Sequence, residues 1–318
     1  MPAVFHHRFH AMASPCEICL AASDAQQAQH LAHSAMHEVM RIEAKYSRYR
    51  PDSVLSHLAA QAGHGWLECD DETLALLDCA HALHVQSGGL FDASSGVLRH
   101  GWNLQQAALP SAVQLQALRG LVGWDQVERN GSRVRLAKAG MELDFGGFGK
   151  EYAADRAAAV LAGQGVAHGY VNLGGDIRVV GPKPDGQPWL VGIQHPDASR
   201  AQAGSPARPW QSQASGATPA RLLASIALSG GGLATSGDYE RGFTLDGRRY
   251  SHVLDPHSGW PVQGWRSISV QADTALQAGA LATIALLKQA EALAFLQDAG
   301  VAYLALDSGG QLHSCAPG

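Results

Sequence analysis

A glycine-rich turn joins a short apolar stretch to a predicted helix at residues 141–157, MELDFGGFGKEYAADRA. Its glycines, Gly146, Gly147 and Gly149, let the backbone come close to a ligand or only to another strand. Glycine loops that precede helices commonly hold phosphates. The stretch is not a P-loop, because Glu151 stands where a magnesium-binding hydroxyl would be, and it does not match G-x-G-x-x-G. Alone, it leaves ligand binding and simple packing equally open.

Helical and strand patterns mix without strict alternation, which predicts an α+β fold rather than a doubly wound sheet. Apolar spacing and capping residues predict the helices, and short apolar runs between turn residues predict the strands. The predicted helices are 25–46, 71–87, one from Ser111, 150–161 and 274–298. The predicted strands include SPCEICLAA, MELDFG, GYVNLGGDIRVVG and WLVGIQHP, with a hairpin turn at Asn130-Gly131. Residues 197–220, rich in Ala, Ser, Pro and Gly, are predicted to form a surface loop.

Composition argues against several classes of protein. Apolar residues make up 46% and charged residues 16%, which is typical of a globular protein with a sizeable core. A net charge of −5 without a basic run argues against nucleic-acid binding. No stretch approaches the roughly 20 apolar residues of a membrane helix, and no signal peptide is visible. We therefore expect no membrane insertion and a cytoplasmic location, or a periplasmic one if an export signal has been removed.

Two groups of potential metal ligands have simpler explanations. Cys16 and Cys19 form a C-x-x-C on a predicted strand, where residues three apart point to opposite faces. The total of five cysteines is odd and fits a reducing compartment. His6, His7 and His10 are expected to form a solvated or strand-borne cluster.

Three further turns combine glycines with polar residues. Gly174 and Gly175 precede Asp176 in YVNLGGDI, GLATSGDYERGF carries Thr235 to Tyr239, and YSHVLDPHSGWPV carries His252 and Asp255. Each could be an ordinary turn. Together with the 141–157 loop, they predict one extended cleft for a long ligand that bears phosphates.

These segments also resemble the FAD:protein FMN transferases, the ApbE family. The resemblance covers nearly the whole chain and rests on seven segments in order: MASPCEI, YSRYRPDSVLSHL, FDASSGVL, LDFGGFGKEYAAD, VNLGGDI, TSGDYER and HVLDPHSGWPV. It implies one domain over 5–318 of the α+β type, with mixed sheets, packed helices and two subdomains enclosing an FAD cleft.

The resemblance implies a reaction and a set of residues. A Ser or Thr hydroxyl of an acceptor flavoprotein attacks the FMN-side phosphorus of FAD, and AMP leaves. His252 would be the base, with Asp255 orienting its turn or assisting, and Tyr49 would lie against the flavin ring. The residues implied in FAD binding are Met12, Ser14, Tyr49, Asp92, Gly146, Gly147, Lys150, Asn172, Gly174, Gly175, Asp176, Ser236, Gly237, Asp238, Tyr239 and His252.

The resemblance also implies a Mg²⁺ site, held through the backbone carbonyl of Gly149 and the side chain of Thr283. Gly279 stands where the family pattern A-D-A-[LI]-[SA]-T has a metal-binding Asp, which would weaken the site, because Mg²⁺ favours carboxylate oxygens. We expect that an Asp at 279 would restore this ligand on the helical face of Thr283. Two alternatives to transfer therefore stay open: an FAD-binding carrier or regulator without catalysis, and an FAD hydrolase that yields FMN and AMP.

Overall fold

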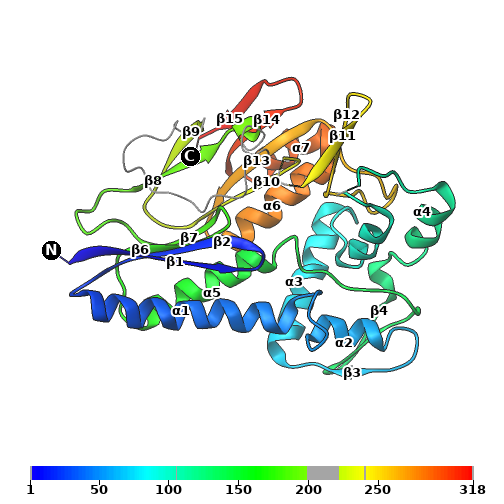
Figure 1. The fold of residues 1–318 in the computed structure, drawn as a ribbon, viewed down its shortest axis with the longest axis horizontal. Coiled ribbons are helices and arrows are strands. Elements are labelled where there is room, and N and C mark those ends of the chain that lie inside the picture. The colour runs from blue at the N-terminus through cyan, green and yellow to red at the C-terminus, as the bar shows by residue number, and fades with distance from the viewer. Residues whose placement is uncertain (1, 105, 199–221, 240, 317–318) are drawn as a thin grey trace.

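The computed structural model describes residues 2–104, 106–198, 222–239 and 241–316. Its main element is an eight-stranded antiparallel sheet in the order β1-β2-β6-β7-β10-β13-β14-β15 (Figure 1). The strands are β1 (Ala3–Ala11), β2 (Ser14–Ala22), β6 (Gly169–Leu173), β7 (Asp176–Gly181), β10 (Gly232–Gly237), β13 (Trp265–Ala272), β14 (Ala302–Asp307) and β15 (Leu312–Cys315). This arrangement of helices and antiparallel sheets confirms the predicted α+β class.

Three helices cover one face of this sheet, and a two-stranded sheet covers the other. The helices are α1 (Ala25–Tyr46), α5 (Gly149–Gly163) and α6 (Ala275–Lys288), with α5 packed against both of the others (Figure 1). The two-stranded sheet is β8 (Trp189–Gln194) with β9 (Leu222–Leu228). Cys16 belongs to the core on the helix side and Cys19 to the cluster under β8 and β9. The two cysteines therefore point to opposite faces, as predicted.

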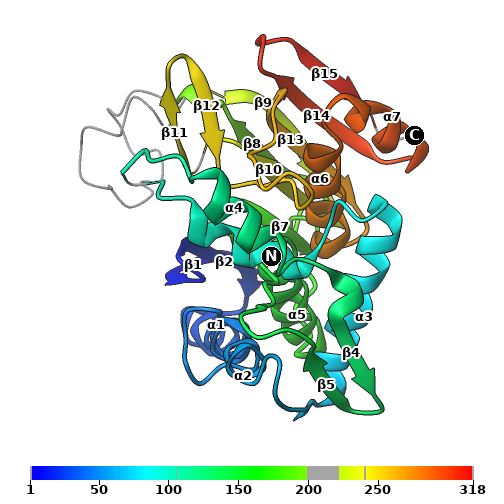
Figure 2. The ribbon, with the colours of Figure 1, turned by 90° about the vertical axis from the view of Figure 1, so that its right-hand side faces the viewer.

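A second group of elements lies to one side of the main sheet and its helices, on the right in Figure 1 and toward the viewer in Figure 2. It contains α2 (Val54–Ala60), β3 (Leu67–Glu68), α3 (Asp71–Ser87), η1 (Ala93–Gly101), α4 (Ala112–Arg119), η2 (Trp124–Gln126), β4 (Val127–Asn130) and β5 (Arg133–Leu136). The remaining elements are η3 (Pro196–Ala198), the hairpin of β11 (Gly242–Leu245) and β12 (Arg248–Ser251), η5 (Gln289–Glu291) and α7 (Ala292–Asp298).

The helices with clear end signals form where the sequence predicts them. The side chain of Asp24 accepts a hydrogen bond from the Gln27 N–H at the start of α1, and Asp70 accepts one from Thr73 at the start of α3. Gly88 ends α3 in the left-handed conformation, with φ of 69°. Helices α1 and α3 thus have the predicted bounds.

Four local predictions are corrected. The stretch GYVNLGGDIRVVG, predicted as one strand, forms the antiparallel strands β6 and β7, because Gly174 and Gly175 turn the chain between Leu173 and Asp176. The stretch MELDFG forms no strand, and its Asp144 N–H instead donates to the carbonyl of Ala93. The β4–β5 turn is Gly131-Ser132 rather than Asn130-Gly131, because Asn130 still pairs with Arg133. A positive φ at only the first turn residue, Gly131, fits a type II′ turn.

The predicted helix 274–298 is broken into α6 and α7. Gln289 ends α6 with φ of 51°, and its carbonyl accepts a hydrogen bond from the Trp265 indole N–H at 2.7 Å. Its side chain also accepts from the N–H of Gln263. These contacts with distant residues hold a backbone conformation that a continuous helix does not allow.

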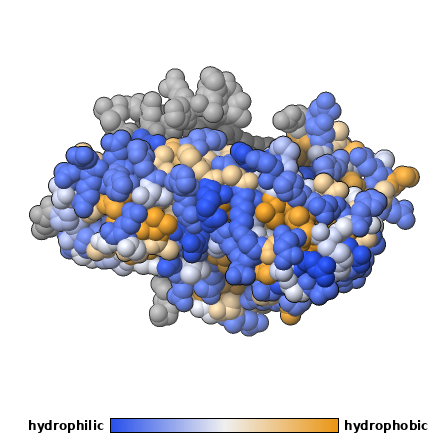
Figure 3. Space-filling view, turned by 90° about the horizontal axis from the view of Figure 1, so that it is seen from below, coloured by the Kyte–Doolittle hydropathy of each residue, from blue (hydrophilic) through white to orange (hydrophobic). Residues whose placement is uncertain are grey.

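In the described part of the chain, the stretch Ala275–Asp298 is long and apolar enough to cross a membrane by length and composition, contrary to the sequence expectation. A buried core helix meets the same criterion, and α6 packs against β10 and β13. Seen from below, the molecule is mainly hydrophilic with separate apolar patches (Figure 3). The predicted surface loop 197–220 lies outside the described residues except for its first two positions, and the single domain over 5–318 stays a prediction.

Candidate flavin and cation site

The start of helix α5 meets the turn between β6 and β7. The Lys150 ammonium pairs with the carboxylate of Asp176 at 2.8 Å, and the Asp176 side chain is buried. A Cβ placed on Gly174 would lie 3.4 Å from Lys150 Nζ, so the glycine lets the turn approach the lysine. The sequence motifs around 150 and 174 therefore form one site, as predicted.

The β1–β2 hairpin turn forms a wall of the same site. Met12 and Ala13 both have positive φ, 50° and 56°, as the two residues of a type I′ turn require. The N–H of Met12 donates to the carboxylate of Glu43 on α1 at 2.8 Å. Ser14 follows, and a Cβ on Gly174 would lie 2.8 Å from its side chain. Ser14, Gly174 and Lys150 are therefore neighbours.

The glycines of the β6–β7 turn have a structural role, because they allow the backbone conformation of the turn. Gly174 and Gly175 have φ of 63° and 101° and join Leu173 to Asp176 in a two-residue turn. The side chain of Asn172 accepts the N–H of Gly175 at 2.9 Å. These contacts explain the Asn-x-Gly-Gly-Asp pattern structurally, and the predicted role of Asn172 in binding FAD stays a prediction.

Loop 144–148 reaches helix α6 through Gly147. A Cβ on Gly147 would lie 2.8 Å from the Phe91 ring and 3.8 Å from the Thr283 methyl group. The Thr283 hydroxyl is 2.9 Å from the hydroxyl of Ser236 on β10. Gly149 is the first residue of α5. The residue before it, Phe148, occupies the N-cap position and makes no side-chain hydrogen bond to the helix. The structure thus brings Gly147, Ser236 and Thr283 together, and the predicted metal contact of the Gly149 carbonyl stays a prediction.

Glu151 occupies the space beside Gly279. A Cβ on Gly279 would lie 2.4 Å from Glu151 Oε1 and 2.6 Å from its Cγ. Burial and then the negative charge of Asp176 raise the pKa of Glu151. An aspartate at 279 therefore requires the Glu151 side chain to move, and the expectation that it would restore a ligand stays a prediction.

Tyr49 is not a core residue, because 70% of it is exposed. Its ring lies under the guanidinium of Arg48, 4.8 Å from ring centroid to Cζ, and Arg48 donates to its hydroxyl at 2.7 Å. Arg48 also pairs with Asp144, which accepts the N–H of Gly146. The exposed ring is thereby fixed to the glycine-rich loop.

His252 lies among cations. Its Nδ1 is 3.3 Å from the carbonyl oxygen of Arg241, which can only accept, so Nδ1 carries the proton of the neutral ring and Nε2 is free to accept one. Although the residue is exposed, loss of hydration and then the charges of Arg241, Lys150 and Arg48 lower the pKa of His252. A neutral imidazole at neutral pH suits a general base.

Of three further predicted carboxylates, two hold the local backbone. Asp255 accepts the N–H groups of His257 and Ser258 and so fixes its turn. Asp92 caps η1 through the N–H of Ser94 and also accepts from Trp124.

The third carboxylate, Asp238, pairs with Arg266 and Arg249. The ring of Tyr239 packs on Gly237, where a Cβ would lie 2.6 Å from it. Roles of these five predicted residues in binding or catalysis stay predictions, as do those of Met12, Gly146 and Gly175.

Sequence reasoning missed three residues. Arg48 and Arg241 lie inside the motifs YSRYR and GDYER and bring positive charge to His252. Asp155 on α5 accepts the N–H groups of Ala275 and Leu276, both at 2.9 Å, and so docks the start of α6. The arginines could have been noticed as cations within the cleft motifs, whereas the docking role of Asp155 depends on a distant helix.

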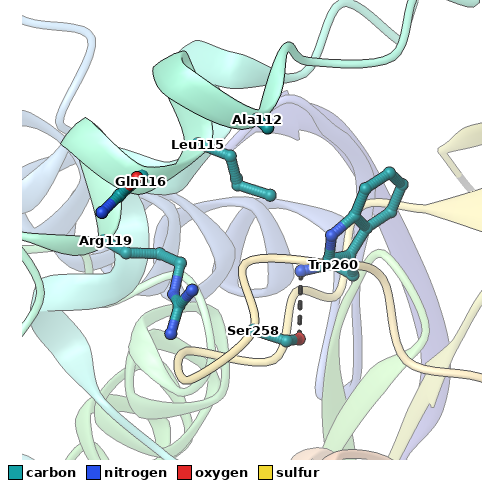
Figure 4. A pocket seen from close by; sticks show the side chains of 6 residues that line it. All are labelled: Ala112, Leu115, Gln116, Arg119, Ser258 and Trp260. Atoms are coloured by element: carbon teal, nitrogen blue, oxygen red, sulfur yellow. Dashed lines mark hydrogen bonds between the residues drawn. The ribbon is translucent and has the colours of Figure 1, made fainter.

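A separate pocket of about 350 Å³ lies between α4 and the turn after Asp255 (Figure 4). Trp260 and Leu115 face each other across it, with Arg119 and Ser258 on another side. None of the residues that meet around Lys150 lines this pocket. It is therefore not the site assembled by the glycine-rich turns.

The fold and this site define an α+β protein whose cation-lined turns suit an anionic ligand. The family model of the ApbE family matches residues 12–305, and the chain belongs to this family. It is 32% identical over 273 residues to the FAD:protein FMN transferase of Treponema pallidum, covering 79% of this chain and 70% of that protein. The corresponding protein of Klebsiella pneumoniae is 29% identical over 236 residues, covering 73% and 67%.

Solved structures give the same fold. The ApbE protein of Thermotoga maritima superposes with a TM-score of 0.84 at 27% identity, over 98% of this chain and 97% of that one. The apo flavinyl transferase ApbE of Pseudomonas stutzeri gives a TM-score of 0.81 at 26% identity, over 98% and 95%.

Proposed function

We propose that this protein is an FAD:protein FMN transferase. The observation that carries the proposal is the placement of a free imidazole nitrogen on His252 within a cation-rich cleft formed by the motifs that carry the resemblance to relatives of that name. Lys150, Arg48 and Arg241 supply positive charge for a diphosphate, and the exposed ring of Tyr49 offers a face for the flavin.

In the proposed reaction, a Ser or Thr hydroxyl of an acceptor flavoprotein attacks the FMN-side phosphorus of FAD. A new P–O bond forms, the bond to the AMP phosphate breaks, and AMP leaves. His252 takes the hydroxyl proton at Nε2. The cations orient the diphosphate and offset its charge, which is most of what a protein contributes to phosphoryl transfer.

We propose that Mg²⁺ assists this reaction by neutralising charge on phosphate oxygens. The Thr283 hydroxyl and the Gly149 carbonyl would help to hold it. In the described residues, no three His, Cys, Asp or Glu side chains gather into a metal site of their own. That fits Mg²⁺, which commonly combines one or two carboxylates with substrate phosphates.

The test is AMP release from FAD with Mg²⁺, with and without an acceptor flavoprotein domain that carries a Ser/Thr flavinylation motif. Transfer requires AMP and covalently bound FMN only when the acceptor is present. AMP without acceptor would indicate FAD hydrolysis. Binding of FAD without AMP under either condition would support the carrier or regulator instead.

His252 provides the sharper variant. His252→Ala should lower turnover by roughly 10²–10⁴-fold and leave FAD affinity nearly unchanged, because general bases contribute about that much. His257→Ala is the matched control, since His257 is an exposed histidine five residues further along the chain. Turnover of His252→Ala equal to that of the control would remove His252 from the mechanism.

A further inference from the structure

Gly279 is an unusual residue for its position. It is buried in the interior of α6, where glycine is up to about 1 kcal/mol less favourable than alanine. A Cβ there would lie 2.4, 2.6 and 2.7 Å from Oε1, Cγ and Cδ of Glu151. The missing side chain of α6 therefore leaves the space that a side chain of α5 fills.

Glu151 is itself an unusual buried residue. It is only 6% exposed, and its Oε2 has no hydrogen-bond partner. The nearby Lys150 forms its ion pair with Asp176, whose negative charge repels that of Glu151. A buried carboxylate without a partner is strongly unfavourable unless a cation or donor meets it.

Oxygen atoms suited to a hard cation lie close by. Thr283 is one helical turn beyond Gly279 on α6, and its hydroxyl is 2.9 Å from that of Ser236. Carboxylate and hydroxyl oxygens are ligands that Mg²⁺ and Mn²⁺ favour. Glu151 therefore packs against α6 at Gly279, one helical turn from the Thr283 hydroxyl.

We propose that Glu151 supplies, from α5, the carboxylate for a divalent cation at this site, and that Gly279 provides the space for it. The inference rests on the proposed function for the identity of the cation. In this assignment the carboxylate comes from α5, the helix that faces Gly279.

The affinity for Mn²⁺, measured by EPR, tests the assignment without relying on turnover. ADP is present in the samples as a diphosphate that supplies phosphate oxygens. Glu151→Gln keeps the shape of the side chain and removes its charge. We expect it to weaken Mn²⁺ binding by about 10-fold or more, because loss of even an outer partner of a metal ligand typically costs 10–100-fold. The matched control is Glu291→Gln, since the Glu291 side chain is 78% exposed.

Variants that move the carboxylate from position 151 to position 279 test whether the two residues share one space. Gly279→Asp alone should bind Mn²⁺ more weakly than wild type, because two carboxylates compete for one space. The double variant Glu151→Gly with Gly279→Asp should bind more tightly than Glu151→Gly alone. Wild-type affinity in Glu151→Gln, absence of Mn²⁺ binding by the wild type, or a double variant no tighter than Glu151→Gly would each overturn the proposal.

AMP release in the same samples separates this inference from the proposed function. Mn²⁺ binding as expected, without transfer of FMN to an acceptor, refutes the transferase and leaves the carboxylate assignment standing. Normal transfer together with unchanged Mn²⁺ affinity in Glu151→Gln refutes the assignment alone. Circular dichroism and thermal unfolding of each variant confirm that the comparison is made between folded proteins.

Discussion

Gly279→Ala measures how firmly Glu151 fills the space between α5 and α6. The added Cβ would lie 2.4 Å from Glu151 Oε1, 2.6 Å from Cγ and 2.7 Å from Cδ. Unbonded carbon atoms normally stay about 3.5–4.0 Å apart. The buried glutamate therefore has to move, and overpacking of this kind costs about 1–3 kcal/mol.

An opposing effect sets the net magnitude. Alanine within a helix is up to about 1 kcal/mol more favourable than glycine. We therefore expect Gly279→Ala to lower the free energy of unfolding by up to about 2 kcal/mol. Gly163→Ala is the matched control, because Gly163 ends α5 and a Cβ there would meet nothing within 4 Å. The control should stabilise the protein by up to about 1 kcal/mol.

Urea denaturation at constant m-value gives both numbers. In a Glu151→Ala background, Gly279→Ala should become stabilising, because the atoms it meets are gone. The difference between the two backgrounds is the coupling energy of the pair. If Gly279→Ala stabilises the wild type as much as Gly163→Ala does, Glu151 does not occupy this space and the reasoning fails.

Three further predictions concern the cleft. Tyr49→Leu should weaken binding of FAD and FMN by about 1–3 kcal/mol, by analogy with base stacking, and leave AMP affinity unchanged in calorimetry; equal affinity for FAD would refute stacking. Because loss of hydration and then nearby positive charge lower the pKa of His252, and the neutral ring is the active base, activity should fall with decreasing pH only below the ordinary histidine pKa of 6.5. Arg241→Gln should move this acid limb to higher pH, and an unmoved limb would argue against His252. Ala13→Gly should raise the free energy of unfolding by about 0.5–1 kcal/mol, because φ of 56° strains alanine more than glycine. The urea midpoint should therefore rise, and a lower midpoint would contradict this.

The sequence predicted elements whose end signals are local. Helix α3 has Asp70 at its start and Gly88 after its end, so its bounds depend on residues within the segment. The break at Gln289 could not be predicted, because it depends on a hydrogen bond from Trp265 on another strand. The stretch MELDFG was mistaken for a strand because its apolar residues are buried by packing without a ladder partner.

The residues of the site likewise divide into those that the sequence could predict and those that only the packed structure reveals. Motif resemblance predicted Lys150, Asp176 and Thr283; the structure pairs the first two and places Thr283 beside Gly147 of the glycine-rich loop. The resemblance could not reveal that Glu151 fills the space left by Gly279, since this relation exists only once two helices are packed together. Considered separately in the sequence, Gly279 suggests a lost metal ligand, and Glu151 only argues against a P-loop.

The pairing of β2 with β6 has a consequence for the order in which the protein folds. The β1–β2 hairpin is local, but its neighbour in the sheet begins at Gly169, and Cys16 pairs with Leu173. Closing so long a loop costs chain entropy before the contact stabilises anything, and such pairings slow folding. Ser14 therefore reaches Gly174 and Lys150 only after most of the chain has been synthesised. On the ribosome, the β1–β2 hairpin can therefore form long before α5 and the β6–β7 turn have been synthesised to complete the cleft.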